Sequence, residues 1–235
     1  MIGEIGALIN EIEESHKARY DTEIMALQAQ INPHFIYNTL SSIRMMAMIQ
    51  SDTSIVRMLD AFISLMQYSA NFTEPTLTMR DEACFLEQYI YIQQMRYNAQ
   101  ILFTIDFAED TLDLPILRFV IQPLLENSIF HGMFDNVAQG QITVRALRDA
   151  DCLRIQVIDN GEGMDNETLR KVTASGITGR GMSRIGVRNV NERIKILYGD
   201  QYGLSVESSK GLGCTVTILF PLLQDHETTP KQTTE

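Results

Sequence analysis

The chain has 235 residues, of which 45% are hydrophobic and 21% are charged, and its formal net charge is −11. Length and composition predict a globular protein with one large domain or two small ones. The negative charge excludes nucleic acid as an expected partner, because nucleic-acid binding needs clustered Lys and Arg. The widely spaced Cys84, Cys152 and Cys214 contain no CxxC pair, which excludes a disulfide framework or a local zinc site.

Residues 5–48 carry a helical pattern in which apolar Ile24, Leu27 and Ile31 recur at steps of three and four. Pro33 interrupts this pattern, and an interior proline costs a helix about 3 kcal/mol, so it needs a compensating reason. The next position on the apolar seam is His34, whose neutral imidazole is a nucleophile near pH 7. The alternative is that His34 is a polar seam residue that only fixes the register of packed helices.

A second helix is expected from Ile55 to a point before Pro75, after turn and N-cap residues at 51–54. Two antiparallel helices joined by a short loop form a hairpin, and two hairpins form a four-helix bundle. One hairpin cannot bury both of its apolar stripes. We therefore expect a homodimer through residues 20–72.

The pattern after Pro75 changes to mixed helices and strands. Helices are expected at residues 81–97, 115–130 and 187–197, and strands at 101–107, 141–146, 153–158, 204–207 and 215–220. This mixture predicts the α+β class, with an α/β sandwich after the helical hairpin. The polar residues 224–235 are expected to form a disordered tail.

The predicted strand at 153–158 runs into Asp159, Gly161 and Gly163. A carboxylate at a strand end can accept a hydrogen bond from an exocyclic amine, and the two glycines allow the backbone to turn tightly beside a ligand. A plain turn containing Asp and Gly explains this DxGxG pattern equally well when it is considered alone.

A glycine cluster precedes the helix expected at 187–197, and its members are Gly176, Gly179, Gly181 and Gly186. A helix N-terminus reached through glycines suits a phosphate group. The cluster is neither a Walker A loop, since no Gly-Lys-Ser/Thr follows, nor a GxGxxG dinucleotide motif.

Asn127 and His131 lie four residues apart near the end of the helix expected at 115–130, so they share one helix face. An Asn carbonyl beside triphosphate oxygens suits Mg²⁺, which takes oxygen ligands and keeps several waters. Ordinary capping contacts at a helix end are the alternative for both side chains.

Four motifs occur in a fixed order, namely Gln30-Ile-Asn-Pro-His34-Phe, Gln122-Pro-Leu-Leu-Glu-Asn127-Ser-Ile-Phe-His131-Gly, Asp159-Asn-Gly-Glu-Gly163 and Ile185-Gly186-Val-Arg-Asn189-Val-Asn-Glu-Arg193. Together they resemble the H, N, G1 and G2 boxes of the sensor histidine kinases of the LytS/YesM type. The resemblance covers about residues 20–222, and the opening residues 3–10 resemble the end of a HAMP signalling module.

The resemblance implies a reaction and its residues. His34 would accept the γ-phosphoryl group of Mg·ATP and pass it to an aspartate of a response-regulator receiver domain. Asn127 would bind Mg²⁺ and, with His131, contribute to the nucleotide site. Asp159 would read the adenine amine, and Glu126 would have an assisting role. The glycines that would shape the pocket and its lid are Gly161, Gly163 and Gly186.

The resemblance also implies a domain plan: a signalling helix at 1–22, dimerisation and phosphoacceptor helices at 23–74, an ATPase domain at 75–223 and the tail at 224–235. A hinge near residues 71–75 would bring His34 to the nucleotide. The chain would then be the cytoplasmic portion of a cell-membrane receptor whose upstream membrane sensor segment is absent from this sequence.

Arg184 departs from the family pattern, which usually has Gly-Ile-Gly-Leu where this chain has Arg184-Ile-Gly186-Val. Arginine restricts the backbone and adds a charge near the expected phosphates. One alternative function is therefore a non-catalytic dimeric scaffold that binds nucleotide poorly. Another is a serine kinase of the anti-sigma type, because one nucleotide-binding fold serves several chemistries.

Overall fold

The computed structural model describes residues 33–70, 75–97, 100–132, 139–174 and 182–222. The helical pattern expected before Pro33, most of the glycine cluster and the expected disordered tail lie outside these residues. The chain forms two compact units, Met1–Ile63 and Ser64–Glu235, which are described separately below. No helix among the described residues combines the length and apolarity needed to cross a bilayer.

The described part of the first unit is a helical hairpin made by α2 (Pro33–Ile49) and the beginning of α3 (Thr53–Ala70). The carboxylate of Asp52 caps α3 by accepting the backbone N–H of Ile55 at 3.0 Å. An ion pair between Arg44 of α2 and Asp60 of α3 connects the two helices across the turn. The expected hairpin and its capping turn are thus confirmed.

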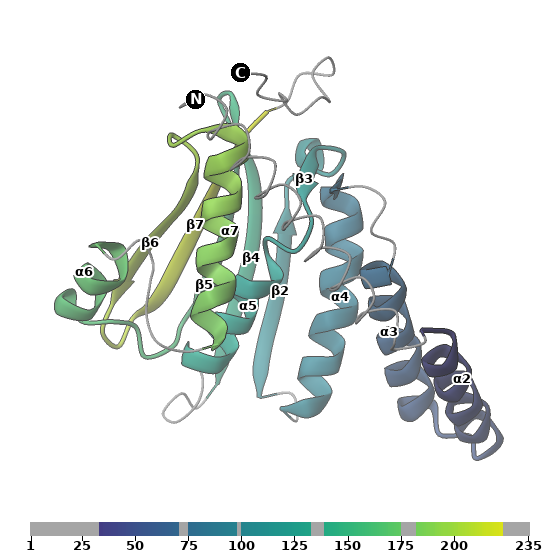
Figure 1. Ribbon diagram of the computed structural model, residues 1–235. Coiled ribbons are helices and arrows are strands. Elements are labelled where there is room, and N and C mark those ends of the chain that lie inside the picture. Colours follow the sequence, from purple (N-terminus) through teal and green to yellow (C-terminus); the bar gives the residue numbers. More distant parts are fainter. Residues whose placement is uncertain (1–32, 71–74, 98–99, 133–138, 175–181, 223–235) are drawn as a thin grey trace, which may run out of the picture. The chain divides into compact units, whose positions relative to one another are not determined.

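The second unit is built on a five-stranded sheet with the order β2-β4-β5-β7-β6 (Figure 1). Its strands are β2 (Ile101–Phe107), β4 (Gly140–Asp149), β5 (Cys152–Asp159), β6 (Gly203–Ser209) and β7 (Gly213–Pro221). β2 pairs with β4 in parallel, and the other three pairings are antiparallel. All five expected strands are confirmed. A separate antiparallel pair joins β1 (Thr76–Thr78) to β3 (Pro115–Leu117).

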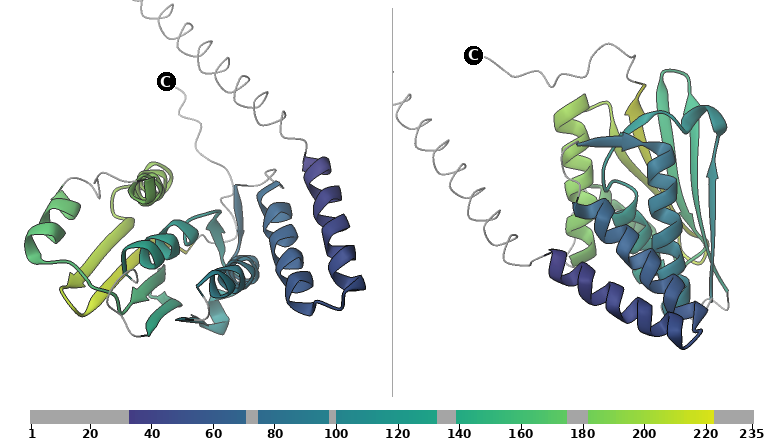
Figure 2. Two further views of the ribbon diagram at one scale, coloured as in Figure 1. Left: turned by 90° about the horizontal axis from the view of Figure 1, so that it is seen from below. Right: turned by 90° about the vertical axis from the view of Figure 1, so that its right-hand side faces the viewer.

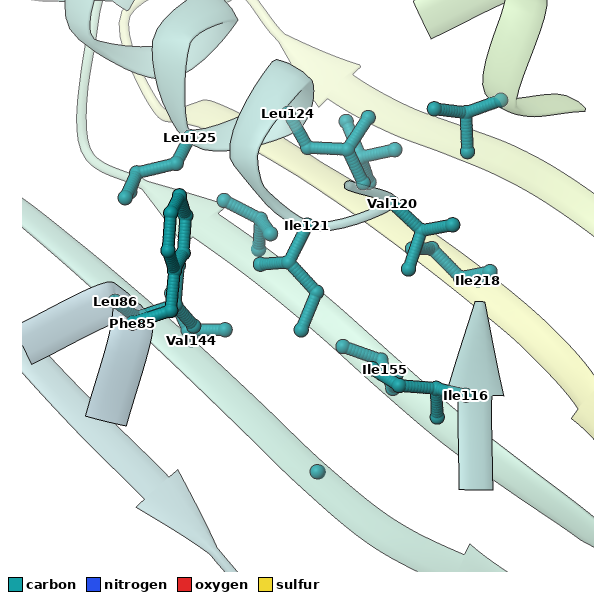
Figure 3. Packing of buried hydrophobic residues seen from close by; sticks show 14 of the residues in the cluster. Phe85, Leu86, Ile116, Val120, Ile121, Leu124, Leu125, Val144, Ile155 and Ile218 are labelled. Carbon is teal, nitrogen blue, oxygen red and sulfur yellow. The ribbon is translucent and has the colours of Figure 1, made fainter. Parts of the chain in front are cut away.

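Helices α4 (Met79–Arg96), α5 (Gln122–Asn127) and α7 (Met182–Tyr198) cover one face of this sheet (Figure 2). The helices cover this face because its side chains are apolar. In β5, for example, the buried Leu153, Ile155 and Val157 alternate with less buried polar residues, and the two-residue period of a strand places all three on one face. Figure 3 shows side chains from α4, α5 and the sheet meeting in this core. The α+β class is confirmed.

The prediction of a helix at 115–130 is wrong for residues 115–121. Pro115–Leu117 form β3, and Phe119 then has a left-handed backbone conformation with φ 58°, which a helix does not allow. The α-helical part is only Gln122–Asn127, after which Ser128–Gly132 continue as a π-helix. The apolar pattern reflected burial on all sides, and burial alone does not distinguish a helix from a short buried strand.

Three further elements were not expected from the sequence: β1, α6 and the short 3₁₀-helix η1 (Glu109–Thr111). β1 is only three residues long and is recognisable only through its pairing with β3. α6 (Asn166–Ala174) follows Asp165, whose carboxylate accepts the backbone N–H of Thr168 at 2.7 Å. The sequence signal for α6 was Asp165 itself, because Asp is a common N-cap residue just before a helix.

Candidate functional site

The centre of the candidate site is Asp159, the last residue of β5, which is only 6% exposed. Its Oδ1 accepts the backbone N–H groups of Gly161 at 3.0 Å and of Cys214 at 3.2 Å. Its Oδ2 accepts the hydroxyl of Ser128 at 3.0 Å. Burial raises the pKa of Asp159 above its usual range, and these three hydrogen bonds act in the opposite direction. The carboxyl group is therefore fixed in orientation at the end of the strand.

The hydrogen bond from Ser128 to Asp159 joins two motifs that are far apart in the sequence. Ser128 directly follows Asn127, which is the half-buried last residue of α5. Asn127, the expected metal ligand, and Asp159, which is expected to bind the adenine amine, thus belong to two segments in direct contact. His131 lies in the π-helix that starts at Ser128, and its side chain lies outside the described residues.

Gly163 allows the loop after Asp159 to pack against the β6–β7 hairpin. Its φ is +64°, and a Cβ atom here would lie 2.0 Å from the carbonyl oxygen of Ser209. The backbone N–H of Gly211 donates to the Glu162 carbonyl at 2.6 Å, and that of Met164 donates to Ser208 Oγ at 2.8 Å. This glycine is required by a close backbone approach within the protein itself.

Gly213 is a site residue that the sequence reasoning missed. Its φ is +90°, and a Cβ atom would lie 1.9 Å from the Asp159 carbonyl oxygen. It precedes Cys214, whose N–H donates to the Asp159 carboxylate. Only the pairing of β5 with β7 brings these residues to Asp159, so the sequence alone carried no signal for this contact.

Gly186 lies within α7, where a Cβ atom would be 3.2 Å from Cβ of Pro123 in α5. Its small size therefore permits close packing of the two helices that carry the N and G2 motifs. The backbone of Arg184 also belongs to α7, whereas a glycine-rich loop was expected up to residue 186. The side chain of Arg184 lies outside the described residues.

Glu126 is half-buried and already accepts two hydrogen bonds from within the protein. Its Oε1 accepts Gln122 Nε2 at 2.8 Å and the Tyr89 hydroxyl at 3.4 Å. Burial and the charge of Glu126 raise the pKa of Tyr89, so this hydroxyl remains a donor. These contacts favour a positioning role for Glu126 at the end of α5.

His34 belongs to α2 in the first unit, whereas Asn127 and Asp159 belong to the second. Its side chain lies outside the described residues. The structure therefore places the described parts of the N, G1 and G2 motifs in the second unit, whereas His34 belongs to the first.

The oxygen and nitrogen groups of the second unit suit an adenine nucleotide. The carboxylate of Asp159 has the chemistry to accept a hydrogen bond from an exocyclic amine, and the amide oxygen of Asn127 is of the type that Mg²⁺ takes as a ligand. In the described part of the chain, no three His, Cys, Asp or Glu side chains gather as a metal-binding cluster. Mg²⁺ in nucleotide sites takes one or two protein ligands together with phosphates and waters, so this set of residues fits a metal held mainly by the nucleotide.

Comparison with known proteins gives two family matches. Residues 22–101 match the family described as "Histidine kinase". Residues 112–224 match the family described as "Histidine kinase-, DNA gyrase B-, and HSP90-like ATPase". The first match spans the helical hairpin and continues through β1 and α4, and the second covers the remaining strands and helices of the sheet-containing unit from residue 112 on.

Individual relatives agree with these families. The sensor histidine kinase YesM of Bacillus subtilis is 34% identical over 221 residues, which cover 94% of this chain and 37% of the relative. The sensor protein LytS of Staphylococcus epidermidis is 31% identical over 213 residues, covering 88% of this chain and 35% of the relative. The chain thus spans little more than a third of the length of these relatives.

Among solved structures, the histidine kinase domain from the Erythrobacter litoralis EL346 blue-light activated histidine kinase is 18% identical. The superposition has a TM-score of 0.48 and covers 81% of this chain and 86% of that chain.

Replacing Ser128 by alanine should raise the pKa of Asp159 further, because the lost hydroxyl stabilises the ionised carboxylate. The free energy of unfolding should fall by about 1–3 kcal/mol. When folding raises the pKa of a carboxyl group, the folded protein is more stable at low pH, where the group is protonated. This stability is lost as the pH rises through the raised pKa. The loss caused by Ser128→Ala should therefore be larger at neutral than at acid pH.

Carboxyl carbon NMR titration and denaturant unfolding would measure these effects. Ser205→Ala, at an exposed position of β6, is the matched control and should change neither quantity. An unchanged Asp159 pKa in Ser128→Ala would contradict the assigned role of the hydroxyl.

Proposed function

We propose, since this chain belongs to the sensor histidine kinases, that it transfers the γ-phosphoryl group of ATP to His34 and then to an aspartate of a response-regulator receiver domain. The observation that carries this proposal is the hydrogen bond of Ser128 to Asp159, because it joins two of the nucleotide motifs in one place. The order of the family matches along the chain supports the same reading.

In the proposed reaction, an imidazole nitrogen of His34 attacks the γ-phosphorus. A nitrogen–phosphorus bond forms, the bond from the γ-phosphorus to the bridging oxygen breaks, and ADP leaves with the electron pair. Such transfers depend mainly on positioning and on neutralisation of charge. Mg²⁺ held by Asn127 would supply the positive charge that the phosphates need.

The residues of the second unit would bind and orient the substrate. The carboxylate of Asp159 would accept a hydrogen bond from the adenine amine, and its three internal donors would keep it in place. Glu126 would fix the end of α5 through Gln122 and Tyr89, and so position Asn127. Preorganised groups of this kind lower the barrier without moving during the reaction.

His34 and Asp159 lie on different compact units, so the reaction requires the units to dock. A signal would then act by changing the population of the docked arrangement. We propose that this chain is the kinase portion of a longer receptor, on the cytoplasmic side of a membrane. The fraction of the relatives' length that the chain spans supports a longer protein.

We propose that a second copy of the chain covers the helical hairpin. Large apolar side chains are exposed along α2 and the first part of α3, namely Phe35, Ile43, Met45, Met46, Met48, Ile49, Ile55, Met58 and Phe62. Burying such stripes between two hairpins gives a four-helix bundle. Within α3, Ile55, Met58 and Phe62 follow helical spacing and form one stripe.

Replacing His34 by glutamine should abolish acid-labile labelling of the protein by γ-labelled ATP and Mg²⁺, because the acceptor nitrogen is removed. The affinity for ATP should stay within about twofold of wild type, since the nucleotide motifs lie on the other unit. His16→Gln is the control and should keep the label. Acid-stable label on serine would instead indicate a different kinase class, and no label on wild type would indicate a scaffold.

Replacing Asp159 by asparagine should weaken ATP binding by roughly 10- to 100-fold, since a hydrogen bond to a charged group contributes about 1.5–3 kcal/mol. GTP binding should change less, because guanine carries a carbonyl where adenine carries the amine. Isothermal titration with both nucleotides measures this difference. Asp149→Asn, at a carboxylate paired with Arg154, is the control. Equal losses for ATP and GTP would exclude adenine reading by Asp159.

Replacing Met58 by glutamate should convert a dimer into monomers at micromolar concentration, because a charge would enter the buried seam of the bundle. Thr53→Glu places the same charge in the first turn of α3, at an exposed position on the face opposite the apolar stripe, and should leave the dimer intact. Sedimentation velocity distinguishes the two species. A monomeric wild type would rule out the proposed bundle.

A further inference from the structure

The second unit contains a buried carboxyl group, Glu82 of α4, that the proposed reaction does not use. Its side chain is 0% exposed. Oε2 accepts the hydroxyl of Tyr68 at 2.7 Å, and the backbone N–H of Ile121 also donates to this carboxyl. No donor among the described residues reaches Oε1. A buried carboxylate with an incomplete set of donors is destabilising, so it calls for an explanation.

Tyr68 belongs to the end of α3, beyond the point where the first unit stops at Ile63. Its ring lies against Phe85 with centroids 4.2 Å apart and against Phe119 at 5.6 Å. Arg118 places its guanidinium carbon 5.3 Å from the centroid of the same ring, and its Nη1 donates to the Tyr68 backbone carbonyl at 3.2 Å. Both the main chain and the side chain of Tyr68 are therefore held by the second unit.

The residues that hold Tyr68 also contact the helices of the candidate site. The carbonyl of Arg118 accepts Nη1 of Arg193, from α7, at 3.0 Å. Ile121 immediately precedes α5, whose last residue is Asn127. The segment 118–121 thus connects the end of α3 to the two helices that carry the N and G2 motifs.

We propose that Tyr68, Glu82 and Arg118 form a latch that holds residues 64–70 of α3 on the second unit, and that loss of the Glu82 proton opens it. The latch is defined by these three side chains. Each of its contacts lies within the second unit, so it does not depend on how the two units are arranged.

The charged and titratable groups around Glu82 determine the direction of this switch. From α3 it faces the Tyr68 hydroxyl, from the segment before α5 it faces Arg118 and the Ile121 N–H, and Asp81 is its neighbour on α4. Burial raises the pKa of Glu82 to about 7, which outweighs the lowering by Tyr68, Ile121 and Arg118. Burial and the Glu82 charge also raise the pKa of Tyr68, so its hydroxyl remains the donor.

Opening the latch would expose the Glu82 carboxyl to water and return its pKa toward the ordinary value of 4.5. The open form then loses its proton more readily than the closed form, so a rise in pH favours opening. With pKa values of 4.5 and about 7, the opening equilibrium constant increases about tenfold between pH 6 and pH 8.

The consequence for the reaction rests on the proposed function. While the latch is closed, residues 64–70 move with the second unit, and any bend between the units must lie before Ser64. An open latch frees residues 64–70 from the second unit, so the bend is no longer restricted to the chain before Ser64. His34 then reaches the nucleotide more easily, so autophosphorylation should be faster when the latch is open.

Hydrogen–deuterium exchange of the whole chain tests the latch without any need for kinase activity. After correction for intrinsic exchange rates, peptides covering residues 64–70 should exchange about tenfold faster at pH 8 than at pH 6 in the wild type. Glu82→Gln cannot ionise and should remove this dependence on pH. Glu87→Gln makes the same substitution at an exposed position of α4 and should behave as wild type.

Tyr68→Phe keeps the ring contacts and removes only the hydroxyl, so residues 64–70 should exchange faster at both pH values. Exchange in the wild type that does not change with pH, or a Glu82→Gln protein that matches the wild type, would overturn the latch. Autophosphorylation adds a second readout: the ratio of rates at pH 8 and pH 6 should be larger in wild type than in Glu82→Gln. Equal ratios would overturn control of the reaction by the latch, whereas a wild type without label would count only against the kinase function.

Discussion

The buried carboxylate of Asp159 is the constraint on which the candidate site depends. A carboxylate that is 6% exposed is stable only with hydrogen-bond donors around it, and three separate segments supply them through Ser128, Gly161 and Cys214. Each donor requires its segment to approach the end of β5. The start of the π-helix, the loop after β5 and the beginning of β7 are therefore positioned by one group.

Two glycines make this approach possible. At Gly163 and Gly213 the backbone has positive φ, and in each case a Cβ atom would lie 2.0 Å or less from a carbonyl oxygen. Any side chain would push the loop after Asp159 away from the β6–β7 hairpin. The geometry of the carboxylate thus depends on backbone packing as well as on its hydrogen bonds.

Glu82 and Asp159, the buried carboxyl groups among the described residues of the second unit, differ in how many hydrogen-bond donors their oxygens have. Both oxygens of Asp159 accept hydrogen bonds, whereas among the described residues one oxygen of Glu82 has no donor. The first arrangement suits a group whose position must not change during binding. The second suits a group whose protonation changes how firmly the end of α3 is attached.

The sequence determined the strands, the helical hairpin and the α+β class, because side-chain periodicity and turn residues are local properties. It also indicated the family through four ordered motifs. It failed between residues 115 and 130, where strand pairing of Pro115–Leu117 and positive φ at Phe119 overrode an apolar pattern. The sequence also carried no sign that Leu65 and Tyr68, near the end of α3, pack on the core of the second unit.

The sequence by itself therefore decided which residue types were available for the proposed nucleotide site, namely Asn127, Asp159 and the surrounding glycines. Only the tertiary structure decided that Ser128 and Cys214 hold Asp159, and that Tyr68 of α3 binds Glu82 and Arg118. These contacts join residues 14 to 55 positions apart. Sheet pairing and burial bring them together, and no local pattern of residues encodes that approach.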